Sequence, residues 1–387
     1  MKILTIGASP YLLVRNGKMN ADVIERFISE GHQVSSAVWH HDEGYFMPSD
    51  EGVHAYEKDG RTICQLYPFT PKTEEASPFI YELMKRIQPD LVVTIGDHKD
   101  TNFIYAIKAM YPTLFKWIAI YTFDSKGLSP SLKDAFEYAD CSLVTSDFGA
   151  EEILAVANVK CICNPYGVNH QIFNYIDGFD RDTVLCSARN AQASNLPAFI
   201  MAMAGTGIKS YLHTNLYDPG DYNIDLLKER YKADNLEYTS DYCSIKDGIP
   251  SSKLNEIYNK SAVIVDCSIK SATGLSLLEG MACGCVPVGP NYGRVGEIIS
   301  QMPEGLKFTV SYNTFIGQNE EEFAIISPTE LRSIVYDVMS DKGRLKEASE
   351  AAKQLAVIYS SNRFLDNLMA AVKETASSKQ CMVLDSV

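Results

Sequence analysis

The chain has 387 residues, about two to three times the roughly 100 to 200 residues of one domain, so we expect two domains. Apolar residues make up 46% and charged residues 22% of the sequence, a balance typical of globular proteins that excludes wholesale disorder, collagen-like repeats and coiled coils. The formal net charge of -14 disfavours DNA and anionic membranes as partners.

The sequence predicts a soluble, cytoplasmic protein with free thiols. Its first ten residues contain too short an apolar run for a signal peptide, and no apolar stretch approaches the roughly 18 residues of a membrane-spanning helix. The close cysteine pairs Cys161/Cys163 and Cys283/Cys285 are separated by one residue, not by the roughly two to four residues of most zinc sites. We therefore expect the cysteines to pack as small apolar side chains.

Short apolar runs alternate with segments of helical periodicity along the first half of the chain. This alternation is typical of a parallel sheet covered by helices. Strands are predicted at residues 2–6, 33–39, 91–95, 117–121, 142–145 and 160–163, and a helix at residues 20–29. Residues 1–170 are therefore predicted to form a doubly wound, Rossmann-like domain.

A polar, turn-forming segment at residues 174–182 is predicted to link this domain to a second one of the same type, at residues 183–360. The second domain has predicted strands at residues 183–187, 210–213, 262–266 and 286–288, and helices at residues 196–204, 225–232, 253–259 and 275–283. A capping box from Ser327 to Glu330 begins a helix that runs to residue 339. Helices at residues 342–359 and about 362–375 follow, and the tail at residues 376–387 is expected to be flexible.

Ligands of open parallel sheets bind beyond the carboxyl ends of the strands, where loops and helix N-termini converge. Two such domains facing each other would enclose a cleft. The segments that would line it are residues 7–10, 97–102, 122–126, 187–190, 213–215, 266–274 and 289–296. Ser9 would then face the cleft from the first domain and His213 from the second.

The segment at residues 271–287 carries the strongest local pattern. Gly274 opens a predicted helix, and Glu279 follows about one turn later. A helix N-terminus binds a diphosphate through its backbone N–H groups, so Ser271, Thr273, Gly274 and Leu275 are candidate donor-binding residues, and Glu279 could accept hydrogen bonds from ribose hydroxyls. The alternative is that Gly274 is only a turn residue and Glu279 a solvated helix charge.

Arg189 and Asn190 directly follow the strand predicted at residues 183–187. A guanidinium at this position could hold a leaving diphosphate through bidentate hydrogen bonds. The alternative for Arg189 is a solvated surface side chain.

Four polar residues follow predicted strands of the first domain: Asp97, His98, Asp100 and Asp124. They could hydrogen-bond to sugar hydroxyls, with Asp97, His98 and Asp124 as candidate catalytic groups and Asp100 as a further binding residue. Helix capping or a turn is the alternative for the three aspartates. Metal ligation is disfavoured because adjacent positions on a turn do not converge on one ion.

Several segments together resemble the retaining glycosyltransferases of the GT-B fold, family four. They are residues 31–34, 116–124, 139–149, 164–169 followed by Phe173, 184–190 and 271–287. They span nearly the whole chain in the family's order. The resemblance implies an α/β GT-B fold: two facing Rossmann-like domains with a C-terminal helix that crosses back onto the first.

The resemblance also implies a function: a hexose is transferred from a nucleoside-diphosphate sugar, UDP favoured over GDP, to an acceptor hydroxyl, with retention of configuration and without a metal or other cofactor. The C-terminal domain would hold the donor, with Arg189 on the diphosphate, Glu279 on the ribose, and N–H groups of Gly274 and Leu275 on the phosphates. The N-terminal domain would hold the acceptor, with Ser9, Asp100 and Tyr166 on that side, and His213 would lie on the donor side.

Three departures from the family pattern affect the expected donor site. The first member of the family's carboxylate pair falls on Ser271, and the Lys usually found a few residues after the Arg falls near Ser194. The family's His-Gly-Val-Asp motif is here Tyr166-Gly-Val-Asn169. Ser271 and the lost Lys favour the main alternative, a sugar-nucleotide-binding protein or degenerate, non-catalytic GT-B member, whereas the retained Arg189 and Glu279 argue against it. A GT-B-shaped epimerase is a second alternative.

The acceptor class stays open at the level of sequence. A glycan, a lipid, a small molecule and a hydroxymethylated base of phage-type DNA all carry a suitable hydroxyl. The net charge disfavours DNA, although Arg15, Lys18, Arg26 and Lys99 could form a local basic strip. A steep salt dependence of acceptor binding would indicate DNA. The sequence carries no signal for the oligomeric state.

Overall fold

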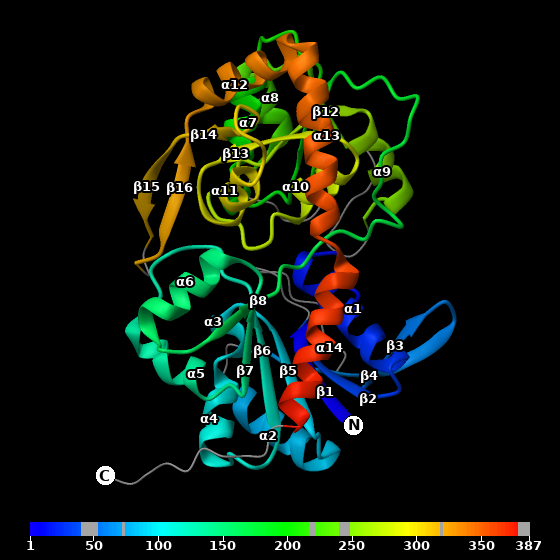
Figure 1. Cartoon of the computed structure of the whole chain (residues 1–387), viewed down its shortest axis with the longest axis vertical. Helices are drawn as coiled ribbons and strands as arrows, with labels where there is room; N and C mark the ends of the chain where they lie inside the picture. The colour runs from blue at the N-terminus through cyan, green and yellow to red at the C-terminus, as the bar shows by residue number, and fades with distance from the viewer. Residues whose placement is uncertain (40–52, 72–73, 217–221, 240–247, 318–319, 378–387) are drawn as a thin grey trace.

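The computed structural model describes residues 1–39, 53–71, 74–216, 222–239, 248–317 and 320–377. Two α/β domains lie one above the other along the long axis of the molecule (Figure 1), the lower built mainly from the first half of the chain and the upper from the second. Every strand predicted from the sequence is present. Across the described ranges, no helix is both long and apolar enough to cross a bilayer.

The N-terminal sheet has eight strands in the order β3-β4-β2-β1-β5-β6-β7-β8, all paired in parallel except the β3–β4 hairpin. Six residues of β1 are buried, because helices cover both faces of the sheet. The strands are β1 (Lys2–Ala8), β2 (Gln33–Trp39), β3 (His54–Lys58), β4 (Arg61–Pro68), β5 (Leu91–Gly96), β6 (Lys116–Tyr121), β7 (Cys141–Val144) and β8 (Cys161–Cys163). The helices are α1 (Arg15–Ser29), α2 (Ala76–Ile87), α3 (His98–Thr101), α4 (Phe103–Met110), η1 (Pro130–Leu132), α5 (Lys133–Glu137) and α6 (Asp147–Val156).

The first helix begins earlier than predicted. It starts at Arg15 after Val14, a residue whose side chain provides no cap, so the usual sequence signal for a helix start is missing. The earlier start places Arg15 and Lys18 in the first turns of α1, directly after the β1 strand end.

The C-terminal sheet has six parallel strands in the order β11-β10-β9-β12-β13-β14. Its strands are β9 (Thr183–Ser187), β10 (Ser210–His213), β11 (Leu236–Tyr238), β12 (Ser261–Val265), β13 (Val286–Pro290) and β14 (Phe308–Val310). Its helices are η2 (Gln192–Ser194), α7 (Leu196–Met203), α8 (Ile224–Tyr231), α9 (Ser251–Asn259), α10 (Leu275–Ala282), α11 (Gly293–Ser300), α12 (Pro328–Ser340) and α13 (Lys342–Ile358). The predicted capping box is confirmed, since the Glu330 N–H donates to the Ser327 hydroxyl at the start of α12.

A C-terminal helix, α14 (Ser361–Ser377), crosses back onto the N-terminal domain, as predicted (Figure 1). Phe364, Leu368 and Val372 join the core beneath the N-terminal sheet. At the crossing, the Val168 N–H donates to the Tyr359 carbonyl (2.9 Å). The expected tail begins inside this helix, and its residues 378–387 lie outside the described ranges.

A β-hairpin that the sequence did not predict projects from the C-terminal domain toward the N-terminal one (Figure 1). It consists of β15 (Tyr312–Ile316) and β16 (Glu322–Ile326), paired antiparallel. The Glu322 N–H donates to the carbonyl of Lys126, in the loop after β6 (3.1 Å). The hairpin therefore adds a contact between the two domains away from the crossing.

Candidate active site between the domains

A cavity of about 960 Å³ lies between the two domains. Its walls come from the segments after β1, β5 and β6 on one side, and after β9 and β10 and from α9 and α10 on the other. In both sheets the strand order reverses beside the strand that leads into the cavity, between β1 and β5 and between β9 and β12. These are the topological switch points at which open α/β sheets bind ligands.

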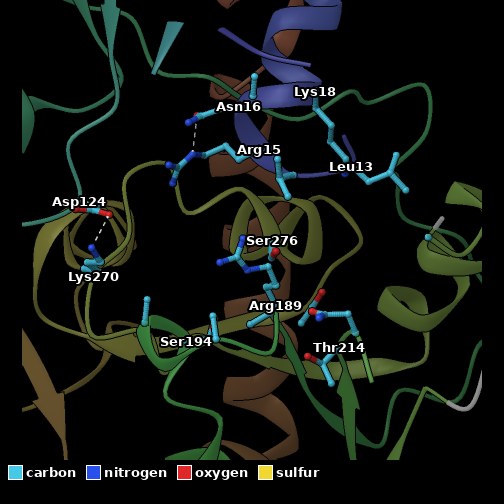
Figure 2. A pocket seen from close by; sticks show the side chains of 18 of the residues that line it. Leu13, Arg15, Asn16, Lys18, Asp124, Arg189, Ser194, Thr214, Lys270 and Ser276 are labelled. Atoms are coloured by element: carbon cyan, nitrogen blue, oxygen red, sulfur yellow. Dashed lines mark hydrogen bonds and ion pairs between the residues drawn. The ribbon is translucent and has the colours of Figure 1, made fainter. Parts of the chain in front are cut away.

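Basic side chains reach the cavity from both domains. Arg189 follows β9, and Arg15 and Lys18 lie at the start of α1. In Figure 2, Arg15 and Arg189 extend toward the cavity from opposite walls. Arg15 Nε donates to Asn16 Oδ1 (3.2 Å). An anionic ligand could therefore be contacted by guanidinium groups of both domains.

Glu279 is a buried acid in the wall of this cavity, with an exposed fraction of 5%. Burial raises the pKa of this carboxyl, while Lys18 and a hydrogen bond from the Tyr258 hydroxyl oppose the rise. The Tyr258 hydroxyl donates to Oε2 (3.0 Å), and Lys18 Nζ lies 3.9 Å from Oε1. The interpretation of Glu279 as a solvated helix charge is therefore wrong.

The start of α10 is shaped by Gly274, whose φ is +59°. A Cβ there would lie 2.6 Å from Ile298 Cδ1, so both conformation and space favour glycine. No side chain caps the helix, and Ser276 of its first turn lines the cavity. First-turn N–H groups have no acceptor within their own helix and are suited to bind an anion.

The other predicted residues of this segment stand back from the cavity lining. Ser271, Thr273, Gly274 and Leu275 are not among the lining side chains, whereas Ser276 is. Thr273 is buried, and Leu275 packs against the core of the N-terminal domain. Any contact of Gly274 or Leu275 with a ligand would have to use backbone groups.

The segment after β10 forms another part of the wall. His213, Thr214 and Asn215 all line the cavity. Burial, together with the charge of Lys18, lowers the pKa of His213 to about 4, so this imidazole is neutral near pH 7. Its Nδ1 lies 2.8 Å from the Thr239 hydroxyl. The Thr214 hydroxyl is buried without a hydrogen-bond partner in the described part of the chain.

Asn190, predicted to contact the donor, instead supports this wall from behind. It is buried and does not line the cavity. Its backbone N–H donates to Asn215 Oδ1 (2.8 Å), and its side-chain Nδ2 donates to the Tyr222 carbonyl (2.8 Å). Its amide hydrogen bonds are thus used to hold the loops after β9 and β10 together.

Asp97 and Asp124 line the cavity from the N-terminal domain. Asp97 caps α3, because its Oδ1 accepts from the Lys99 N–H (2.9 Å), which confirms the capping alternative. Burial would raise the pKa of Asp97, but contacts with His98 and the Lys99 N–H bring it below its ordinary value. Asp97 is therefore a carboxylate at neutral pH. Asp124 Oδ2 lies 3.6 Å from Nζ of Lys270, which belongs to the other domain.

Asp100 also lines the cavity, but His98 does not. His98 is buried, with its ring stacked on Phe123 at a centroid distance of 5.6 Å. Its Nδ1 contacts Asp97 Oδ1 at 2.8 Å. His98 thus touches Asp97 from behind and borders a smaller adjoining cavity.

Ser9 and Tyr166 lie away from the cavity, contrary to the predicted acceptor-side positions. Ser9 is fully buried, and its backbone N–H donates to the Trp39 carbonyl (2.9 Å). The hydroxyl of Tyr166 donates to Asp22 Oδ2 (2.7 Å), and its ring packs edge-on against Phe364 of α14. Tyr166 therefore anchors the crossing helix.

Several lining residues were not among the predicted site residues. Ser194, which occupies the position of the family's second cation, lines the cavity as a hydroxyl. Positive charge comes instead from Arg15, Lys18 and Lys270. Lys270 follows β12 and lies within residues 266–274, a segment that the rule of strand ends predicted to line the cleft. Within the described ranges, no three His, Cys, Asp or Glu side chains are grouped as around a metal ion.

No protein-family model and no curated protein sequence matches the chain. Solved structures do match it over almost its full length. Sucrose-phosphate synthase from Thermosynechococcus elongatus is similar with a TM-score of 0.75 and 15% identity, over 97% of this chain and 98% of that one. The chain has the GT-B fold.

Two further GT-B structures show the same likeness. The α,α-trehalose 6-phosphate synthase from Burkholderia multivorans matches with a TM-score of 0.70 and 9% identity, over 97% of this chain and 99% of that one. The pneumococcal O-GlcNAc transferase in complex with UDP and GlcNAc matches with a TM-score of 0.64 and 10% identity, over 98% of this chain and 99% of that one. The predicted fold class is thus confirmed.

Proposed function

We propose that the protein is a glycosyltransferase that moves a hexose from a nucleoside-diphosphate sugar to an acceptor hydroxyl with retention of configuration. One observation carries the proposal: Arg189, the N-terminus of α10 and the buried Glu279 border one cavity between the domains of a GT-B fold. The similar structures support it, since their names are those of sugar-transferring synthases and a transferase. The UDP present in one of them favours a UDP-sugar over a GDP-sugar.

The donor diphosphate would lie between Arg189 and the first turn of α10, with Arg15 approaching from the opposite domain. Guanidinium groups bind phosphate oxygens in a bidentate manner, and the helix N-terminus adds the positive end of its dipole. Glu279 would accept hydrogen bonds from the ribose hydroxyls. The phosphate charge is then offset by the protein alone, so we expect activity in the presence of EDTA.

In the proposed reaction, the bond between the anomeric carbon and the diphosphate oxygen breaks while the acceptor oxygen bonds to the same face of that carbon. The acceptor proton passes to the departing diphosphate. Arg189 and the α10 N-terminus stabilise the charge that develops on the leaving group, which is the kind of preorganised stabilisation that lowers barriers most. Asp97 and Asp124 would orient sugar hydroxyls on the other side.

A sugar-nucleotide-binding protein without turnover is the second candidate. The hydroxyl of Ser194, at the place of the expected Lys, favours it because one cation of the usual diphosphate site is missing from that loop. The cations at Arg15 and Lys270 favour the enzyme, since they bring positive charge to the same cavity.

The test is a donor and acceptor screen read by mass spectrometry, beginning with UDP- and GDP-sugars and run with EDTA present. Steady release of nucleoside diphosphate, with a glycosylated acceptor, is the expected result. Product anomers are then identified by NMR, and an inverted product would contradict the retaining mechanism. Donor binding without any release over many hours would leave the binding protein as the function.

A further inference from the structure

A second, smaller cavity of about 220 Å³ adjoins the candidate active site. We call it the side chamber. It shares Asp97, Lys99, Asp124 and Glu321 with the large cavity, so the two spaces are neighbours. The rest of its wall is formed by α3 and the loop after β6, with His98, Asn102, Phe123, Ser125, Lys126, Gly127, Leu128, Ser129 and Leu132.

The β15–β16 hairpin completes this chamber from the opposite domain. Glu321, next to β16, is the residue that the C-terminal domain contributes to the wall, and it pairs with Lys99 of α3. The hydroxyl of Tyr292 fixes the junction, because it donates to the Glu322 carbonyl (2.6 Å) and accepts from the Lys126 N–H (3.1 Å). The chamber therefore exists only where the hairpin meets the loop after β6.

The backbone of that loop is shaped for the close contact. Gly127 has a φ of +94°, and a Cβ on it would lie 2.6 Å from the Glu320 carbonyl oxygen. A side chain at position 127 would push the hairpin away. The geometry of the wall thus depends on a glycine in one domain and the hairpin of the other.

The lining favours a neutral molecule with several hydroxyl groups. Asp97, Asp124 and Glu321 present carboxylate oxygens, which accept hydrogen bonds, and the lysines beside Asp124 and Glu321 are already paired with these acids. Asn102 Oδ1 is buried and has no hydrogen-bond partner in the described part of the chain. An unpaired buried acceptor is costly, and a ligand hydroxyl could satisfy it.

The size of the chamber narrows the ligand further. At about 220 Å³ it is smaller than the roughly 300 to 1,000 Å³ of pockets for drug-sized ligands. It has room for one ring, not for an oligosaccharide or a base pair. Lys99 is paired with Glu321, and Asp124 with Lys270 of the other domain, so Asp97 and Lys126 are the charges that remain in the wall and the chamber has no surplus of positive charge for a phosphate.

We propose that the side chamber binds one uncharged, polyhydroxylated ring of the acceptor, and that the hairpin confers this preference. The inference rests on the proposed function and specifies its acceptor: a sugar or cyclitol ring, free or at the end of a glycan. The phosphate of a sugar phosphate or of a DNA backbone would find Lys99 and Lys270 already paired with Glu321 and Asp124.

The test compares binding of neutral rings with binding of their phosphate esters. Full-length protein with UDP present is titrated by ligand-observed NMR with neutral hexoses, pentoses and cyclitols, with glucose 6-phosphate, and with DNA containing hydroxymethylcytosine. We expect at least one neutral ring to bind at least about 10-fold more tightly than its phosphate ester. Tighter binding of glucose 6-phosphate or DNA, or binding of no neutral ring, would overturn the proposal.

A variant that fills the chamber provides the second arm. Ser125 lines only the side chamber, whereas Ser131 lies nearby on the exposed surface and lines neither cavity. Ser125→Trp should weaken binding of the neutral ring by about 10-fold or more, and Ser131→Trp should not. Wild-type affinity in Ser125→Trp would overturn the proposal. Thermal unfolding of both variants identifies a folding defect, and Glu321→Gln, which removes the charge but little volume, is then measured in its place.

Failure of this proposal and failure of the proposed function give different results. Release of nucleoside diphosphate from the donor reports the donor site and needs no ring in the chamber. Binding of neutral rings that is blocked by Ser125→Trp, in a protein that releases no nucleoside diphosphate, would support the chamber and remove the enzyme. Turnover with acceptors that bind wild type and Ser125→Trp equally well would support the enzyme and exclude the side chamber as the acceptor site.

Discussion

Lys18 Nζ in helix α1 lies 3.9 Å from Glu279 Oε1 in helix α10, so an ion pair joins the two domains across the candidate active site. Glu279 is buried, whereas Lys18 keeps part of its side chain in solvent. The desolvation penalty is therefore larger for Glu279 than for Lys18, because removing a charge from water is unfavourable. A donor that engaged Glu279 through its ribose would take over part of this contact.

The first expected outcome concerns the pH dependence of stability. Burial raises the pKa of Glu279 above its ordinary value of 4.5, so the folded state binds a proton more tightly than the unfolded state does. The contribution of Glu279 to stability must then fall as the pH rises above about 4.5. Glu279→Gln should remove this loss. The free energy of unfolding of the variant, measured relative to that of the wild type, should therefore increase with pH.

Urea unfolding of wild type and Glu279→Gln at a series of pH values measures this difference. Glu304→Gln, on an exposed residue, is the matched control. A constant difference between Glu279→Gln and wild type across the pH series would contradict the raised pKa.

His213 should show the opposite slope. Its pKa in the folded protein is about 4 against an ordinary value of 6.5, so the unfolded chain binds the proton more readily between these values. Stability is then lost as the pH falls from 6.5 toward 4, and His213→Gln should lessen that loss. An NMR titration of the imidazole checks the pKa directly; a midpoint near 6.5 would show that the buried environment is absent in solution.

Arg189→Ala should lower turnover by roughly 100-fold or more, because removing one preorganised group that stabilises developing charge typically costs several kcal/mol of barrier. Steady-state release of nucleoside diphosphate is the measurement. Arg230→Ala, on an exposed residue of α8, makes the same chemical change outside the cavity and should leave turnover unaltered. Near-normal rates in Arg189→Ala would remove this residue from the mechanism.

Tyr292→Phe should loosen the junction between the hairpin and the N-terminal domain. The hydroxyl serves the Glu322 carbonyl and the Lys126 N–H together, and leaving such groups unpaired costs about 1 to 3 kcal/mol where they are shielded from water. Tyr336→Phe removes a hydroxyl that bonds the Thr206 carbonyl within one domain, at an exposed site where the cost should be below about 1 kcal/mol. Chemical unfolding measures the loss of unfolding free energy in both variants. Equal losses would mean that the Tyr292 hydroxyl at the junction contributes no more stability than an exposed hydroxyl within one domain.

The strands of the parallel core were predicted well because strands buried on both faces have an easily recognised sequence pattern. β1, β5 and β6 are almost entirely buried, so they read as continuous apolar runs. The β3–β4 hairpin was missed because it lies at an edge of the sheet and alternates with polar residues. Its turn at Asp59 and Gly60, both with positive φ, is a hairpin signal that could have been used.

The site was predicted only in outline. Position after a strand correctly indicated Arg189, Asp97, Asp124 and His213 as cavity-lining residues, since strand ends converge in such folds. The same rule could not separate Arg189 from its neighbour Asn190, because which of two adjacent side chains faces the cavity depends on the loop conformation.

Contacts between the domains were beyond the reach of sequence patterns. Lys18, Lys270 and Glu321 each meet a residue of the opposite domain, and no local pattern encodes how two domains approach each other. Tyr166 shows the converse: a motif that suggested the acceptor side supports the crossing helix instead.

The two covalent connections between the domains run close together, where Val168 pairs with Ser360, and the β15–β16 hairpin lies apart from them, on the left side of the view in Figure 1. In this arrangement the crossing would be the hinge of a domain rotation, and the hairpin a non-covalent contact away from that hinge. Any rotation about the crossing would have to part Lys126 from Glu322, and with them the contacts Lys18–Glu279, Asp124–Lys270 and Thr145–Ala272. Opening of the cleft would then cost the two hydrogen bonds of the Tyr292 hydroxyl together with the ion pairs that cross the candidate active site.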